Sequence, residues 1–201
     1  ILPGLAITLL IAPIALDWAW PASTGAALVV FTISMLGLAL TPPPVPRRAP
    51  VLRVTRAVVF TLGLMAGGAG LAGALATRQL TLFTLGSAVG VGLVGAMAGR
   101  SAHARIMGWV FAAMMGQFFV LALALVLGLA PAWAAFGVLA VGAVLLMLEA
   151  ALPRLGLPEY RREATTVEWS GYASAILAGV LAYNSPEHLA ALMASFGAVL
   201  G

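Results

Sequence analysis

The strongest constraint on the fold of this chain is a series of apolar segments, most of which approach the length of a membrane span. About 20 apolar residues are needed to cross the hydrocarbon core of a bilayer. Inside that core the backbone N–H and C=O groups find no water, so every crossing segment must be helical. We therefore predict an all-α, polytopic integral membrane bundle of about eight transmembrane helices. The apolar segments cover residues 2–17, 23–41, 57–77, 80–99, 106–129, 132–152, 169–184 and 187–201.

The composition supports a membrane protein and excludes several other classes. Hydrophobic residues make up 63% of the chain and charged residues 8%, against about 45–50% and about 25% in soluble domains. We interpret residues 1–201 as a single transmembrane domain, either complete or a portion of a longer membrane protein. The chain has no cysteine, which excludes disulfides and thiolate chemistry. We expect no cofactor, no metal site and no nucleic-acid partner.

The basic residues indicate how the chain is oriented. Nine of the ten arginines fall in the connections 42–56, 100–105 and 153–168, and the intervening connections hold only Arg78. Cytoplasmic loops carry an excess of basic residues, so we predict four hairpins with both termini in the cytoplasm. All ten basic residues are arginine, and alanine and glycine are abundant. This composition favours a bacterial protein, located in the cytoplasmic (inner) membrane.

The hairpin formed by residues 57–99 holds ten of the chain's 23 glycines. In water each glycine in a helix interior costs about 1 kcal/mol relative to alanine. In a bilayer, small residues four positions apart let two helix backbones approach closely. We therefore predict that this hairpin is the packing centre, and that Gly67 and Gly90 shape a cavity or transport path. Ser87 belongs to the same candidate set, although we expect it to pack as a small residue.

Two polar side chains within the apolar segments are further candidates for the transport path. Gln117 lies near the middle of its segment, where an amide facing lipid would be costly, so it should point into the bundle. It forms either an interhelical hydrogen bond or a polar contact with a solute. Glu149 lies about one turn from the cytoplasmic end of its segment. It is either a carboxylate paired with Arg154 or Arg105, or a site for a proton or a coupling ion.

A group of polar residues is predicted at the outer face. Their default interpretation is a solvated rim, and the alternatives are the mouth of a cavity or an acid–base pair formed by Asp17 and His188. On the opposite side, residues 159–169 mix both signs of charge and suit an interfacial segment. The outer-rim candidates are Asp17, Arg78, Asn184, Glu187 and His188.

Three functions are compatible with these features. We expect a transporter or permease-like component for an apolar, amphipathic or weakly polar solute, because the segments contain few ionisable groups that could hold an ionic one. The alternative is a structural or assembly subunit of a larger membrane complex, in which small residues pack against other subunits or against a second copy of the chain. A membrane enzyme ranks third, because the chain offers few catalytic groups.

Overall fold

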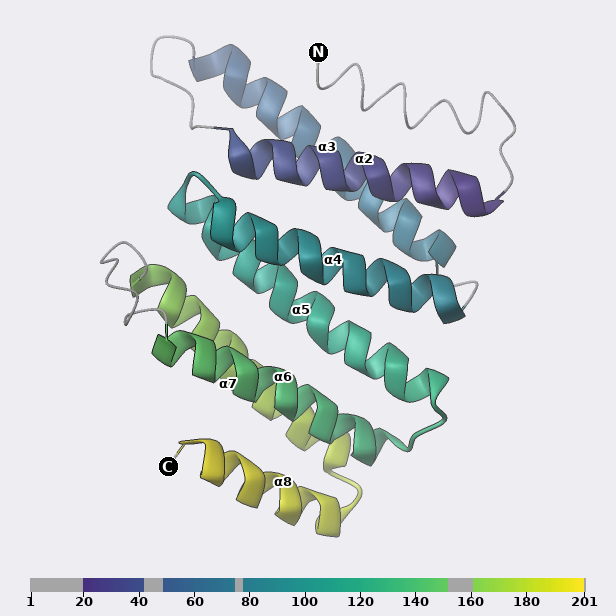
Figure 1. The fold of residues 1–201 in the computed structure, drawn as a ribbon, viewed down its shortest axis with the longest axis vertical. Helices are drawn as coiled ribbons and strands as arrows, with labels where there is room; N and C mark the ends of the chain where they lie inside the picture. Colours follow the sequence, from purple (N-terminus) through teal and green to yellow (C-terminus); the bar gives the residue numbers. More distant parts are fainter. Residues whose placement is uncertain (1–19, 42–48, 75–77, 152–160, 201) are drawn as a thin grey trace. The chain divides into compact units, whose positions relative to one another are not determined.

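The computed structural model describes residues 20–41, 49–74, 78–151 and 161–200. Every regular element in these ranges is an α-helix (Figure 1), so the prediction of an all-α chain is confirmed for this part. The predicted segment 2–17 lies outside the described residues, and the total of about eight helices and the cytoplasmic termini stay predictions. The seven described helices are α2 (Trp20–Leu40), α3 (Ala49–Ala74), α4 (Arg78–Ala98), α5 (Ala102–Val126), α6 (Pro131–Ala151), α7 (Arg161–Ala182) and α8 (Pro186–Leu200).

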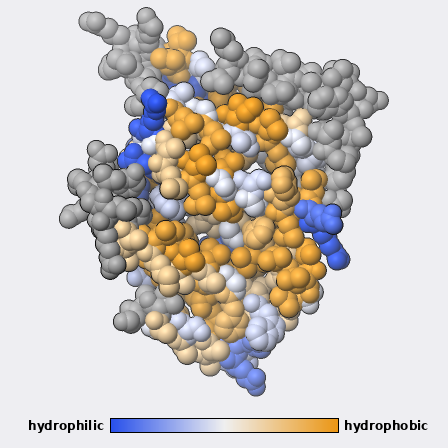
Figure 2. Space-filling view, viewed as in Figure 1, coloured by the Kyte–Doolittle hydropathy of each residue, from blue (hydrophilic) through white to orange (hydrophobic). Residues whose placement is uncertain are grey.

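Four of the described helices are long and apolar enough to cross a membrane. These spans are Val51–Gly73, Arg78–Ala98, Ala102–Val126 and Pro131–Ala151. Large apolar side chains are also exposed on them, for example Phe83 at 72% and Leu125 at 76%. In the space-filling view most of the visible described surface is apolar, and the strongly hydrophilic residues form small separate groups (Figure 2). Monomeric soluble proteins rarely expose such large contiguous apolar patches, so these features suggest a membrane location.

The chain divides into two compact units, residues 1–108 and residues 109–201. The boundary falls inside α5, so this helix begins in the first unit and continues in the second. The expectation of one transmembrane domain over residues 1–201 stays a prediction.

In the first unit, α2 packs along α3, and both contact α4. Four of the five glycines of α3 form the floor of the α2–α3 contact, because each of the four lies beneath a side chain of α2. A Cβ built on Gly67 would come within 2.7 Å of the Phe31 ring, and one on Gly70 within 2.8 Å of Leu28. The α4 and α5 backbones also approach closely, since a Cβ on Gly108 would overlap the backbone N of Ala96.

The carboxyl end of α2 is capped by groups from later in the chain. Arg56 of α3 donates hydrogen bonds to the Thr41 hydroxyl at 2.8 Å and to the Leu38 carbonyl oxygen at 3.1 Å. The backbone N–H of Arg100 donates to the Ala39 carbonyl oxygen at 3.0 Å. The last carbonyls of a helix have no partner within it, and cations are favoured there. Arg56, which the sequence analysis assigns to a cytoplasmic connection, therefore also binds the carboxyl end of α2.

In the second unit, α6 packs closely along α7 because two glycines remove the side chains between them. A Cβ on Gly142 would lie 3.0 Å from the Gly171 carbonyl oxygen, and a Cβ on Gly171 would lie 3.2 Å from the Gly142 carbonyl oxygen. Helix α8 contacts both α6 and α7. The buried core of these three helices consists of Ala135, Val138, Leu139, Ala178, Ala182 and Leu192.

Tight turns join α5 to α6 and α7 to α8. After α5, Gly128 has a φ of 67°, and the N–H of Leu129 bonds to the Ala124 carbonyl oxygen at 2.9 Å. This is the pattern of a Schellman motif, which requires a left-handed residue and so favours glycine. Between α7 and α8, Ser185 precedes Pro186, and Ser and Pro are the residue types favoured at the N-cap and first positions of a helix. The chain therefore reverses direction between α7 and α8 within three residues.

Candidate functional site

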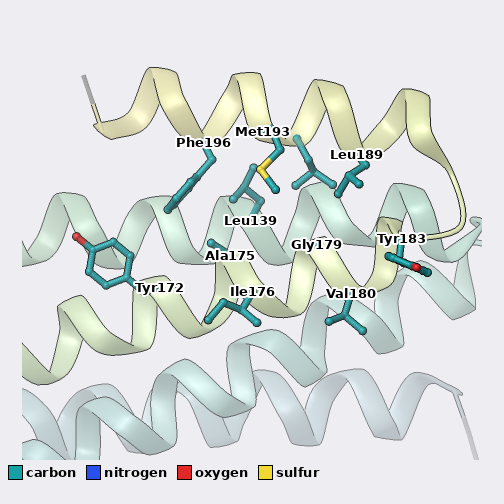
Figure 3. A pocket seen from close by; sticks show the side chains of 11 residues that line it. Leu139, Tyr172, Ala175, Ile176, Gly179, Val180, Tyr183, Leu189, Met193 and Phe196 are labelled. Carbon is teal, nitrogen blue, oxygen red and sulfur yellow. The ribbon is translucent and has the colours of Figure 1, made fainter.

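The second unit contains an open groove of about 630 Å³ formed by α7 and α8, with one residue of α6 at its base (Figure 3). Its walls are almost entirely hydrocarbon, and two tyrosines supply the hydroxyl groups. A volume of this size lies within the range of about 300–1,000 Å³ typical of small-molecule sites. The lining residues are Leu139, Tyr172, Ala175, Ile176, Gly179, Val180, Tyr183, Leu189, Leu192, Met193 and Phe196.

The groove has a defined length because its two tyrosines lie at opposite ends of the α7 wall (Figure 3). Tyr172 and Tyr183 are eleven positions apart, which corresponds to about 16 Å along a helix. Between them, Gly179 leaves the wall open, since a Cβ built there would meet no atom within 4 Å. The arrangement can hold a slender apolar chain, with hydroxyl groups near each end.

Three of the predicted rim residues lie together at the α7–α8 turn, next to one end of the groove. Asn184 and Glu187 are exposed there, and Glu187 occupies the first turn of α8, where the helix dipole favours a carboxylate. His188 is half-buried and packs edge-on against Trp133 of α6, with ring centroids 5.1 Å apart. Its ring therefore belongs to an aromatic contact that joins α8 to α6.

Gln117 of α5 makes an interhelical hydrogen bond with α7. Its Nε2 donates to the Ser174 hydroxyl at 2.7 Å, and that hydroxyl donates to the Ser170 carbonyl oxygen at 2.8 Å. Ser174 is fully buried, and its Cβ would lie 2.9 Å from a Cβ on Gly142. The bond therefore joins α5 to the α6–α7 crossing, as the first interpretation of Gln117 expects. A contact between Gln117 and a solute stays a prediction.

The remaining candidates of the first unit are spread over two helices. Gly67 is buried beneath Phe31, whereas Gly90 and Ser87 are exposed on α4. Arg78 is exposed at the start of α4. Their contribution to a transport path stays a prediction.

Two candidate carboxylates remain. Asp17 lies outside the described residues, as does the predicted Asp17–His188 pair. Glu149 is half-buried near the end of α6, and its predicted partner Arg154 lies outside the described residues. Among the residues that the structure describes, no group of three or more His, Asp or Glu side chains is placed to hold a metal ion.

The sequence analysis missed the groove and a buried carboxylate. Helix α7 begins at Arg161, eight residues before the apolar segment, and Glu163 in its first turn is fully buried. The sequence contains a pattern that indicates the longer helix, because small or apolar residues recur along α7 at helical spacing. The buried positions of this stripe are Ala164, Val167, Gly171, Ser174, Ala178 and Ala182.

The comparisons with known proteins do not assign a function. The chain matches no family model, and no curated protein and no solved structure is similar to it at a significant level. The candidate site therefore stands on its own geometry.

Proposed function

We propose that this chain is a membrane transporter or permease-like component for an amphipathic solute, and that the groove between α7 and α8 is where the solute binds. The groove carries this proposal. Its apolar walls suit hydrocarbon, and the polar residues at the α7–α8 turn suit a headgroup. The lining contains no charged residue that could pair with an ionic solute. A fully ionic solute would therefore lose its hydration in the groove without gaining a partner.

The packing of the second unit joins α5 to the close crossing of α6 and α7. The α6–α7 crossing is a contact of backbone on backbone, because Gly142 and Gly171 face each other. Helix α5 is joined to this pair through the hydrogen bond from Gln117 to Ser174 and through the packing of Val120 and Leu121 on the core. Side-chain hydrogen bonds between helices in a membrane contribute only about 0.6–2 kcal/mol.

The proposal includes a location. The use of arginine alone as the basic residue, with abundant alanine and glycine, favours a bacterial cytoplasmic membrane. The arginine distribution supports a multi-pass protein with both termini in the cytoplasm. The α7–α8 turn would then face the outer side, and a solute would enter the groove from the outer leaflet.

Reconstitution tests the transport proposal. Purified chain in proteoliposomes should accelerate the movement of a fluorescent, short-chain phosphatidylcholine between leaflets, relative to protein-free vesicles. Gly179→Leu should abolish this acceleration, because the new side chain would occupy the groove. Gly197→Leu on α8 is the matched control, since it also has no atom within 4 Å of its Cβ position and does not line the groove. Equal rates for wild type and empty vesicles would reject transport of this class of solute.

A second function, that of an assembly subunit, is favoured by one face of α4. Phe83, Gly86, Gly90, Val94 and Met97 are exposed at helical spacing along it. A Cβ on Gly90 would meet no atom within 4 Å, so another helix could approach this face closely. In this case other subunits should copurify in stoichiometric amounts in mild detergent, and Gly90→Leu should remove them.

A further inference from the structure

Two arginines from other parts of the first unit lie at the carboxyl end of α2. The guanidinium group of Arg56 donates hydrogen bonds to the Thr41 hydroxyl at 2.8 Å and to the Leu38 carbonyl oxygen at 3.1 Å. The backbone N–H of Arg100 donates to the Ala39 carbonyl oxygen at 3.0 Å. Arg56 belongs to α3 and Arg100 follows α4, so their contacts with α2 bring together two cations that are far apart in the sequence.

These contacts lie at one end of three apolar helices. The candidate membrane span of α3 begins at Val51, that of α4 ends at Ala98, and the apolar part of α2 ends at Leu40. Figure 1 shows these three ends on the same side of the first unit. The two arginines therefore lie where apolar helices end, and in a bilayer this is the level of the lipid headgroups.

The charge of the two arginines is not balanced by the surrounding sequence. Residues 18–148 contain seven arginines and no aspartate or glutamate. A helix carries about half a negative charge at its carboxyl end, so the ends of α2 and α4 offset only about one of the two positive charges. A guanidinium group has five N–H donors, and Arg56 donates two hydrogen bonds to α2. Its other N–H groups can therefore donate to a phosphate oxygen.

Apolar side chains beside the arginines favour a lipid over a soluble anion. Phe60 lies four positions after Arg56, on the same face of α3, and it is 43% exposed. Met97 lies three positions before Arg100, in the last turn of α4, and it is 73% exposed. Acyl chains can pack against these two side chains while the arginines hold a headgroup. A soluble phosphate would gain nothing from them.

From this placement, charge and apolar surface, we propose that the carboxyl end of α2 binds the phosphate group of an anionic phospholipid through Arg56 and Arg100. Arg56 is half-buried and is held by α2, and the exposed Arg100 supplies the second charge. Basic groups between membrane helices bind anionic headgroups on the cytoplasmic side, which is the side that the proposed orientation gives to this end of α2. The site lies in the first unit, so it is independent of the α7–α8 groove and of transport.

The test measures which lipids the full chain retains. Purified protein is equilibrated in mild detergent with equal amounts of phosphatidylglycerol and phosphatidylcholine that have the same acyl chains. It is then repurified, and its lipids are counted by mass spectrometry. Wild type should retain phosphatidylglycerol over phosphatidylcholine by about fivefold or more, since each arginine near a membrane surface changes the affinity for anionic lipid by about fivefold. Equal retention of the two lipids would overturn the proposal.

A matched pair of variants separates this site from the overall positive charge of the chain. Arg100→Gln should lower the preference for phosphatidylglycerol by about fivefold. Arg78→Gln removes the same charge at the opposite end of α4 and should leave the preference unchanged. Both arginines are exposed, so neither change puts the fold at risk. Equal effects of the two variants would show that net charge alone selects the lipid, and would overturn the site.

Arg56→Lys tests the guanidinium group at the end of α2. Lysine keeps the charge but lacks the planar fork that can donate to α2 and to a phosphate oxygen together. The preference for phosphatidylglycerol should therefore fall although the net charge is the same. Thermal unfolding in detergent without phosphatidylglycerol shows that the variant is folded. An unchanged preference in folded Arg56→Lys would remove this guanidinium group from the site.

Glycerol 3-phosphate distinguishes a lipid from a soluble phosphate. Salt screens exposed charges, so sodium chloride should release part of the bound phosphatidylglycerol. Glycerol 3-phosphate at the same ionic strength should release no more, because it lacks the acyl chains that pack beside Phe60 and Met97. A larger release by glycerol 3-phosphate would assign the arginines to a soluble phosphate and overturn the lipid site.

Discussion

In the first unit the buried glycines of α3 lie beneath side chains of α2, whereas in the second unit Gly142 and Gly171 lie against each other's backbone. The first arrangement is filled by movable groups such as the Phe31 ring. The second places a backbone carbonyl oxygen opposite each glycine, beside the Ser174 Cβ and the Leu146 side chain, so the distance between α6 and α7 has less freedom to change. A high density of glycine does not by itself locate a rigid crossing or a cavity. What matters is whether a side chain or a backbone occupies the space opposite each glycine.

The largest effect is expected at the α6–α7 crossing. In Gly142→Leu the new side chain would collide with the Ser174 Cβ and the Gly171 carbonyl oxygen, which lie 2.9 and 3.0 Å from the Cβ position. Neither can move without separating the helices, so we expect a loss of about 3 kcal/mol or more in the free energy of unfolding. Thermal unfolding in detergent, followed by circular dichroism, measures this. Gly179→Leu on α7 is the control and should unfold as wild type does.

A smaller effect is expected in the first unit. Gly67→Leu would press on the Phe31 ring at 2.7 Å, and a ring can rotate away, so we expect a cost of about 1–2 kcal/mol. Gly68→Leu is a control one position away, because its Cβ position has no neighbour within 4 Å. The same unfolding measurement applies. If Gly67→Leu were as destabilising as Gly142→Leu, the distinction between a glycine that faces a side chain and one that faces backbone would be wrong.

The hydrogen bond between α5 and α7 should contribute less to the free energy of unfolding than either glycine position. Gln117→Leu removes the donor to Ser174, and we expect a loss of about 1 kcal/mol. A double-mutant cycle with Ser174→Ala isolates the bond, because the two changes should not be additive. Strictly additive losses would show that this bond does not join the helices energetically.

The smallest effect is expected at the end of α2. Arg56→Met removes the hydrogen bonds to Thr41 and to the Leu38 carbonyl oxygen, and we expect a loss of about 0.5 kcal/mol that diminishes at high salt. Arg78→Met, at an exposed position on α4, is the comparison and should be neutral. A loss that does not depend on salt would contradict the electrostatic explanation.

Much of the helical fold could be predicted from the sequence, because apolar length determines where a chain can cross a bilayer. The start of α7 was missed, since residues 161–168 are polar in composition and only Ala164 and Val167 continue the buried stripe of α7 there. The interhelical bond of Gln117 followed from its position in mid-segment. The groove did not, because it is formed by residues such as Gly179 and Met193 from different helices, and nothing in either helix alone indicates a cavity.

The proposed function depends on the groove formed by α7 and α8, which should bind an amphipathic solute in preference to the glycine-rich helices of the first unit. Photo-crosslinking of wild-type protein in vesicles tests it most directly, with a phosphatidylethanolamine that carries a photoactivatable group in its acyl chain. Peptide mapping should show more labelling per exposed residue in 172–196 than in 57–99, and unlabelled phosphatidylethanolamine should compete for the excess. Equal labelling of both ranges, unaffected by competitor, would contradict the claim.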